Sequence, residues 1–307
     1  MSPRGILFTG ATGFIGPHIV RALLARGDSV WVWARDVAKA RRLFGDQVKV
    51  VSALAEIPPA SPIDGVVNLA GAPVVGPPWT RARRQLLIDS RVKPTQAVLA
   101  WSAQRASPPR VLVSASAIGF YGSGDNGWLD ENSPPQDVFQ SQLCLQREAA
   151  ANAAEAQGIR AVNLRIGLVL GRDGGILKQL ALAAKLGGAA VLGDGSQWMS
   201  WIHIDDLVRV VERALDDETM RGALNAVAPE PVRQREFQRA LTRVLHRPLW
   251  LRVPAAFLSV ALGEMSDLLV RSQRVAPRRL ETSGFKFTHP GLEGALRDLL
   301  RGTGAPS

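Results

Sequence analysis

A glycine-rich segment near the start of the chain has the composition of a phosphate-binding loop. Residues 9–16 read Thr-Gly-Ala-Thr-Gly-Phe-Ile-Gly and follow an apolar run. Between a strand and a helix, Gly10 would permit the tight turn, Gly13 would let the backbone approach a pyrophosphate, and Gly16 would let helix and strand pack closely. Three glycines could also merely permit a turn, but the apolar run before them and a helix-period segment behind them favour a binding loop. We expect a dinucleotide here, held by Thr9, Gly10, Thr12, Gly13, Phe14, Ile15 and Gly16.

The end of the next predicted strand indicates which dinucleotide binds. A carboxylate there would accept hydrogen bonds from the ribose 2′-hydroxyl of NAD, whereas an arginine would meet the 2′-phosphate of NADP. The chain has Ala34 followed by Arg35, which favours NADP(H) as the cofactor. Asp36 is a possible ribose ligand by its distance of about 20 residues from the last glycine. We prefer to interpret Asp36 as the N-cap of a helix, because aspartate is among the best capping residues.

Strand and helix signals alternate through the first two thirds of the chain, as in a doubly wound parallel sheet. We expect strands over residues 5–9, 29–34, 48–52, 65–69, 110–114 and 160–166, and helices over residues 14–26, 37–44, 81–105 and 141–157. The predicted fold class is α/β, a Rossmann-like doubly wound parallel sheet with a smaller, mixed but mostly helical C-terminal lobe. Ligands of such sheets bind beyond the carboxyl ends of the strands.

Small and polar residues follow three of the other predicted strands at that same edge. Residues 68–71 follow the fourth strand, residues 114–122 the fifth and residues 165–171 the sixth. Plain turns are the alternative interpretation, but small residues would let the chain pass beside a bound dinucleotide. We assign further cofactor contacts to Leu69, Ala70, Gly71, Ser114, Ala115, Ile166 and Gly167.

No sharp break divides the 307 residues, of which 46% are hydrophobic. A chain of this length suggests one large lobe and one smaller lobe. We expect a dinucleotide-binding domain over residues 1–228, of which parts of 167–228 contribute to a substrate lobe, a C-terminal lobe over residues 229–301, and a flexible tail over residues 302–307. The C-terminal lobe should contain short helices at 233–245, 254–269 and 292–301 and an extended piece at 285–287.

Together, these features resemble the extended epimerase/dehydratase branch of the short-chain dehydrogenase/reductase superfamily. The spacing of Gly10, Gly13 and Gly16, the strand-end segments and the run from Trp201 to Asp206 carry the resemblance. It implies a catalytic tyrosine with a lysine four residues later, which lowers the pKa of the phenol. The chain has a single tyrosine, Tyr121, and Asp125 follows it at that distance, so the pair is absent.

The same resemblance locates the positions that the missing pair would occupy. Aligning Glu148 with the acidic residue that often trails the pair puts Gln140 at the tyrosine position and Cys144 at the lysine position, beside the cofactor. The family's serine position falls on Ala117, with Ser116 next to it. We name Tyr121 and Ser116 as candidate catalytic residues. A buried ring with one hydrogen bond is an equally good interpretation of Tyr121, and an inert hydrophobic role is the usual one for a residue such as Cys144.

Further motifs extend across almost the whole chain. The N-terminal ones are Gly71-Ala72-Pro73, Trp79, Asp89-Ser90-Arg91, residues 116–122 and residues 198–203. The C-terminal ones are Val253-Pro254, Gly263-Glu264-Met265, residues 272–275, Pro277, residues 284–287 and Ala295-Leu296. These motifs resemble the group called epimerase family proteins, found in bacteria and in human cells, and its C-terminal domain of unknown function. The resemblance implies NADP binding on an atypical short-chain dehydrogenase fold.

The charge and composition restrict the partners. A formal net charge of +10 would suit a nucleic acid, but the basic residues are mostly arginines spread through the chain and no nucleic-acid-binding signature accompanies them. We expect no nucleic-acid partner and attribute the charge to an anionic cofactor and an anionic small-molecule substrate. No apolar run of about 18 residues and no leader are present, so we expect a cytoplasmic protein without a membrane partner. Both a monomer and a homodimer fit the sequence.

Other chemistry has little support in the sequence. The single cysteine and the four histidines, His18, His203, His246 and His289, show no metal-ligand spacing, so we expect no metal. Two functions remain. The first is an NADPH-dependent reductase of a small carbonyl-like or imine-like substrate, and the second is a non-catalytic NADPH-binding protein that controls a partner. We prefer the reductase because the C-terminal lobe and the Tyr121 loop can frame a site, and whether the protein is an enzyme stays open.

Overall fold

The computed structural model describes residues 4–123, 127–254 and 272–301. Its centre is a seven-stranded parallel sheet with the strand order β12-β7-β5-β4-β1-β2-β3. The strands are β1 (Gly5–Thr9), β2 (Ser29–Trp33), β3 (Lys49–Val51), β4 (Gly65–Asn68), β5 (Val111–Ala117), β7 (Arg160–Ile166) and β12 (Gly222–Ala226). The chain proceeds from β1 to β2 on one side and to β4 on the other, so the topological switch point lies between β1 and β4. The predicted doubly wound sheet is confirmed.

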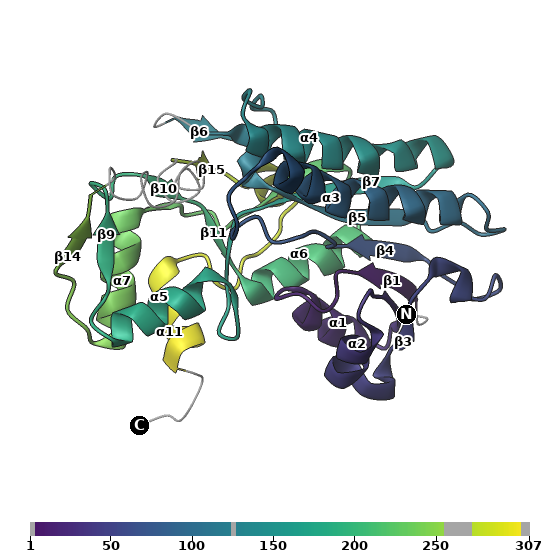
Figure 1. Cartoon of the computed structure of the whole chain (residues 1–307), viewed down its shortest axis with the longest axis horizontal. Helices are drawn as coiled ribbons and strands as arrows, with labels where there is room; N and C mark the ends of the chain where they lie inside the picture. Colours follow the sequence, from purple (N-terminus) through teal and green to yellow (C-terminus); the bar gives the residue numbers. More distant parts are fainter. Residues whose placement is uncertain (1–3, 124–126, 255–271, 302–307) are drawn as a thin grey trace.

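Helices cover both faces of the sheet (Figure 1). The helices α1 (Gly16–Ala25), α2 (Val37–Phe44) and α6 (Ile204–Asp216) pack on one face, and α3 (Arg81–Ser102) and α4 (Phe139–Asn152) pack on the other. The strands alternate between the two cores, since Ile6 and Phe8 face the first set of helices and Leu7 faces the second. None of the described helices is long and apolar enough to span a membrane.

A smaller lobe lies beside the carboxyl edge of the sheet (Figure 1). It contains α5 (Gly175–Lys185), α7 (Gln234–Leu245) and α11 (Leu292–Arg301), with the short strand pairs β9 (Ala190–Leu192) with β14 (Leu251–Val253) and β10 (Trp198–Met199) with β13 (Val232–Arg233). Two further pairs, β8 (Leu168–Leu170) with β11 (Trp201–His203) and β6 (Trp128–Leu129) with β15 (Arg274–Val275), connect this lobe to the sheet. A short helix, α10 (Arg278–Thr282), packs near β12.

The structure departs from the predicted elements at a few points. The predicted helix over residues 141–157 begins at Phe139 and ends as a 3₁₀ turn, Ala153–Gln157. Strand β12 was not predicted, because Gly222–Ala226 contains glycine, alanine and asparagine, which have low strand propensity, and it becomes a strand by pairing with β7. Residues 285–287, predicted to be extended, form no strand in the structure. The predicted helix over 254–269 and the tail 302–307 lie outside the described residues, apart from residue 254.

Candidate cofactor and catalytic site

The glycine-rich loop joins β1 to α1 at the carboxyl edge of the sheet. Gly10 has φ 81°, and a Cβ there would lie 2.5 Å from the carbonyl carbon of Leu69. A Cβ on Gly16 would collide with the carbonyl oxygen of Ala11. By contrast, a Cβ on Gly13 would meet nothing closer than the Gly10 oxygen, at 3.4 Å. The fold itself therefore requires glycine at the first and last positions, whereas the open space at Gly13 fits the close approach of a ligand.

The end of β2 bears out the interpretation of Asp36. Its Oδ1 accepts a hydrogen bond from the backbone nitrogen of Lys39 at 2.8 Å, which caps α2. This carboxylate is therefore engaged by the helix terminus. Arg35 is exposed, and its guanidinium makes no hydrogen bond or ion pair with any residue that the structure describes. It is free to meet an anion beyond the end of the strand.

The loop after β4 lies directly beside the glycine-rich loop. The backbone nitrogen of Leu69 donates to the Thr9 oxygen at 2.9 Å, and that of Ala70 donates to Oδ1 of Asn68 at 3.1 Å. The guanidinium of Arg91 packs against Gly71. The predicted contact residues 69–71 thus lie at the switch point, where dinucleotides cross sheets of this kind.

The predicted residues of β5 and β7 lie deeper than expected. Strand β5 continues to Ala117, three residues beyond its predicted end at Ser114, so Ser114 and Ala115 lie inside the strand and Ser116 lies near its carboxyl end. Ile166 is the last residue of β7. A Cβ on Gly167 would lie 2.7 Å from the Ser200 oxygen, so packing against the neighbouring segment already explains this glycine.

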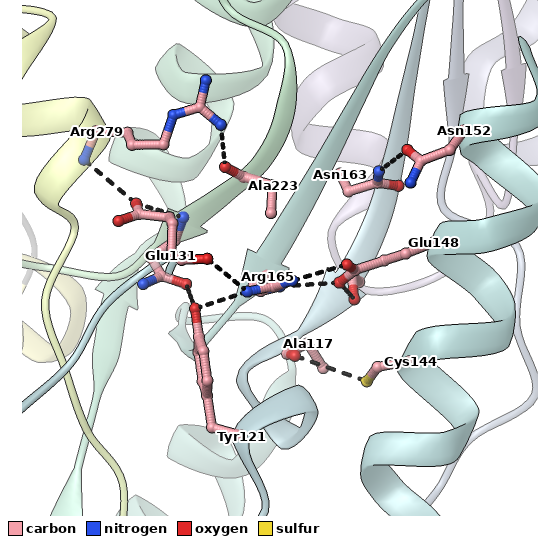
Figure 2. Close-up of polar contacts among 12 residues, drawn as sticks. Ala117, Tyr121, Glu131, Cys144, Glu148, Asn152, Asn163, Arg165, Ala223 and Arg279 are labelled. Carbon is pink, nitrogen blue, oxygen red and sulfur yellow. Dashed lines mark hydrogen bonds and ion pairs between the residues drawn. The ribbon is translucent and has the colours of Figure 1, made fainter. Parts of the chain in front are cut away.

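A buried polar network connects the ends of three strands (Figure 2). The parallel register aligns Ser116 with Arg165 and Arg165 with Asn225 across β5, β7 and β12. Ser116 Oγ donates to Oε1 of Glu148 on α4 at 2.6 Å. Arg165 donates to the same carboxylate from Nε at 3.0 Å and from Nη2 at 2.9 Å. Glu148 and Arg165 were not predicted as functional residues, because their proximity arises from packing between segments that are distant in the sequence.

Tyr121 lies at the other end of this network. It is 1% exposed, its hydroxyl donates to Oδ1 of Asn225 at 2.6 Å and it accepts from Nη1 of Arg165 at 3.0 Å. Burial raises the pKa of Tyr121 to about 12. A phenol is a poor proton donor at neutral pH when its pKa is raised and its proton is already engaged in a hydrogen bond. This geometry favours the interpretation of Tyr121 as a buried, hydrogen-bonded ring.

Helix α4 contains neither tyrosine nor lysine. Cys144 is buried, its Sγ lies 3.6 Å from the Ala117 oxygen, and burial raises the pKa of its thiol. Gln140 lies near Gly119. Cys144 therefore faces the end of β5, and Gln140 faces the segment that follows it. These are the positions to which the resemblance assigns the lysine and the tyrosine. Neither supplies an acid or a cation there.

The structure also gathers polar residues that are distant in the sequence around His203. The side chains of His203, Asp205, His289 and Asp298 present donor atoms within 4.8 Å of one another. However, Nδ1 of His203 accepts a hydrogen bond from the Asp205 backbone nitrogen at 3.1 Å, so the neutral ring has its proton on Nε2, which lies 3.3 Å from Oδ2 of Asp298. Burial and the neighbouring His289 lower the pKa of His203. The arrangement suits a neutral histidine beside a carboxylate better than a metal ligand.

Comparison with known proteins identifies the class. Residues 6–226 match the NAD dependent epimerase/dehydratase family, and residues 253–299 match a domain of unknown function, DUF1731. The chain therefore belongs to the NAD-dependent epimerase/dehydratase family, within the extended short-chain dehydrogenase/reductase branch that its motifs resemble.

Individual relatives refine this assignment. The chain is 37% identical over 297 residues to the epimerase family protein YfhF of Bacillus subtilis, covering 96% of this chain and 97% of YfhF. Its structure is similar to that of the human epimerase family protein SDR39U1 with NADPH, with a TM-score of 0.85, 30% identity, and 97% and 99% of the two chains covered. MoeE5 in complex with UDP-glucose and NAD, at 24% identity and a TM-score of 0.78, shares the fold.

Proposed function

We propose that the protein is an NADP(H)-dependent oxidoreductase that reduces a small anionic carbonyl or imine compound. The cofactor part of the proposal is supported by the open space at Gly13 and by the free guanidinium of Arg35. The human relative that was solved with NADPH agrees with it. The excess of arginine over acidic residues favours an anionic substrate.

The chain's residues fit a dinucleotide in three places. Backbone groups of the glycine-rich loop would hold the pyrophosphate at the N-terminus of α1, where the helix dipole favours negative charge. Arg35 would hold the 2′-phosphate through charge-assisted hydrogen bonds. Residues 69–71 would border the middle of the cofactor. When bound, NADPH supplies the hydride.

The hydrogen bond between Ser116 and Glu148 is the observation on which the catalytic proposal rests. The 2.6 Å contact between Ser116 Oγ and Glu148 Oε1 connects the carboxyl end of β5 to a buried carboxyl group. In the reductive direction, Ser116 Oγ gives its proton to the substrate oxygen or nitrogen while a water molecule gives a proton to Oγ. The Glu148 carboxylate, which Arg165 holds by two hydrogen bonds, accepts from the hydroxyl of Ser116 and orients it. This relay needs neither Tyr121 nor Cys144.

Single-turnover kinetics tests this proposal. Stopped-flow oxidation of bound NADPH against a library of small carbonyl and imine acids would identify the substrate. With that substrate, Ser116→Ala should lower the rate of hydride transfer by about 10²-fold, since positioned proton transfer contributes 10²–10⁴-fold, and should leave NADPH affinity unchanged.

A matched control is Ser102→Ala. Ser102 is a buried serine on α3 whose Oγ has no described partner, and its replacement should leave the rate unchanged. A full rate of hydride transfer in the Ser116→Ala protein would contradict the proposed proton relay. Tight NADPH binding without turnover of any compound would support the non-catalytic alternative.

A further inference from the structure

Arg147 on α4 is a buried cation without an ion-pair partner among the described residues. It is 6% exposed, and its Nη2 donates to the backbone oxygen of Asn68 at 2.9 Å. Its Nε is also buried and has no hydrogen-bond partner in the described part of the chain. A guanidinium buried in this way has lost its hydration without gaining a carboxylate partner, which makes the free energy of folding less favourable.

The surrounding charges do not compensate for Arg147. The next residue, Glu148, is already engaged by Arg165, which donates two hydrogen bonds to its carboxylate and forms a direct ion pair at 2.9 Å. Among the charged groups near Arg147, the strongest influence comes from a second arginine, Arg91, which donates to the Ala72 oxygen at 3.0 Å. Burial and this like charge lower the pKa of Arg147 to about 9, so the group is still positive at neutral pH. The cluster therefore has an excess of positive charge.

The position of this charge points to a ligand. Asn68 is the last residue of β4, and the switch point between β1 and β4 is where a dinucleotide would cross the sheet. Cys144, at the lysine position, lies one helical turn before Arg147 on α4. Arg147 thus brings a cation toward the end of β4 from the helix that lacks the expected lysine.

We propose that Arg147 replaces the missing lysine as the buried positive charge of the site and stabilises the pyrophosphate of a bound dinucleotide. This inference rests on the proposed cofactor. The charge acts through the low-dielectric interior, where interactions over several ångströms stay significant. Since NADPH and NADH share the pyrophosphate, the effect of Arg147 should be the same for both, unlike that of Arg35.

The test compares Arg147→Met, which removes the charge but keeps an apolar side chain of similar length, with Arg147→Lys, which keeps the charge. By calorimetry, Arg147→Met should weaken NADPH and NADH binding equally, by about tenfold, as expected for charges several ångströms apart in a protein interior. Arg147→Lys should stay within roughly threefold of the wild type. The melting temperature of the cofactor-free Arg147→Met protein should be unchanged or higher, because an unpaired buried charge is removed.

A second buried arginine provides the control. Arg160 is also 6% exposed and donates to the backbone oxygens of Ala214 and Met220, but it lies at the amino end of β7, away from the switch point. Arg160→Met should leave both affinities unchanged.

Three results would overturn the inference. Unchanged affinities with a lower melting temperature in Arg147→Met would show that Arg147 only holds the loop after β4. An equal loss of affinity in Arg147→Lys and Arg147→Met would show that hydrogen-bond geometry matters and not charge. Wild-type protein that binds neither cofactor would overturn the proposed function and this inference together, whereas the first two results leave the proposed function intact.

Discussion

The hydroxyl of Tyr121 donates a hydrogen bond to the side-chain oxygen of Asn225. Oδ1 of Asn225 lies 2.6 Å from the hydroxyl, and the other partner, the guanidinium of Arg165, can only donate. With this assignment, the single tyrosine of the chain is not available as a proton donor. It also connects the loop after β5 to strand β12, whose Asn225 in turn donates to the Ala276 oxygen at 2.9 Å.

The ionisation of Tyr121 can be observed without interference from another tyrosine, because the chain contains only one. We expect phenolate absorbance to appear with a midpoint near the pKa of about 12 that burial produces. The unfolded chain loses this proton first, at pH about 10, so the stabilising contribution is complete below that pH and is lost as pH rises toward 12. A midpoint at or below 10 in the folded protein would restore Tyr121 as a proton-donor candidate.

Removal of the Glu148 charge should affect stability as well as rate. Glu148→Gln leaves Arg165 buried without its carboxylate, which should cost about 3–5 kcal/mol of unfolding free energy. Ser116→Ala, which removes only one hydrogen bond to the same carboxylate, should cost about 1 kcal/mol. Urea unfolding of the two variants measures the difference, and equal losses would mean that the bidentate pair contributes nothing beyond a single hydrogen bond.

Arg35 should determine the preference for NADPH over NADH. Charge-assisted hydrogen bonds contribute about 1.5–3 kcal/mol, so Arg35→Ala should weaken NADPH binding roughly ten- to a hundredfold and leave NADH binding almost unchanged. Arg21→Ala, which removes another exposed arginine from α1, is the control and should change neither affinity. If Arg35→Ala weakened the binding of both cofactors equally, the assignment of Arg35 to the 2′-phosphate would be wrong.

Two glycines of the same loop should respond differently to alanine. Gly13→Ala should fold with the stability of the wild type, because its Cβ meets only the Gly10 oxygen at 3.4 Å, but should bind either cofactor at least about tenfold more weakly. Gly16→Ala should destabilise the protein by about 1–3 kcal/mol, because its Cβ collides with the Ala11 carbonyl. Thermal unfolding and calorimetry separate the two effects. A Gly13→Ala protein with wild-type affinity would show that no ligand uses the space.

The stability of the cofactor-free protein should rise above pH 9. Arg147 loses its proton in the folded state near its pKa of about 9, whereas an arginine in the unfolded chain keeps its proton to a higher pH. The unfolded state therefore binds more protons in this range, and stability increases with pH. NADPH affinity should fall over the same range. Because Tyr121 has the opposite effect above pH about 10, the measurement is the difference between wild type and Arg147→Met.

Local signals predicted the nucleotide-binding half of the site. The turn at Gly10, the close packing at Gly16 and the cap at Asp36 each depend on backbone geometry within a few residues, which the residue type largely determines. Six strands were predicted near their observed positions because buried parallel strands are continuous apolar runs. The end of β5 was placed too early because Ala115, Ser116 and Ala117 have the composition of a loop, and pairing with β7 keeps them in the strand.

The sequence alone determined that the chain forms a doubly wound sheet with a dinucleotide loop and that a tyrosine–lysine pair is absent. Tertiary structure decided which polar groups meet. Ser116, Arg165 and Asn225 align only because β5, β7 and β12 pair in one register. Glu148 reaches Ser116, and Arg147 reaches Asn68, only because α4 packs on that face of the sheet. Such contacts depend on register and helix packing between segments far apart in the chain, and the energies that select them belong to the assembled core rather than to any single segment.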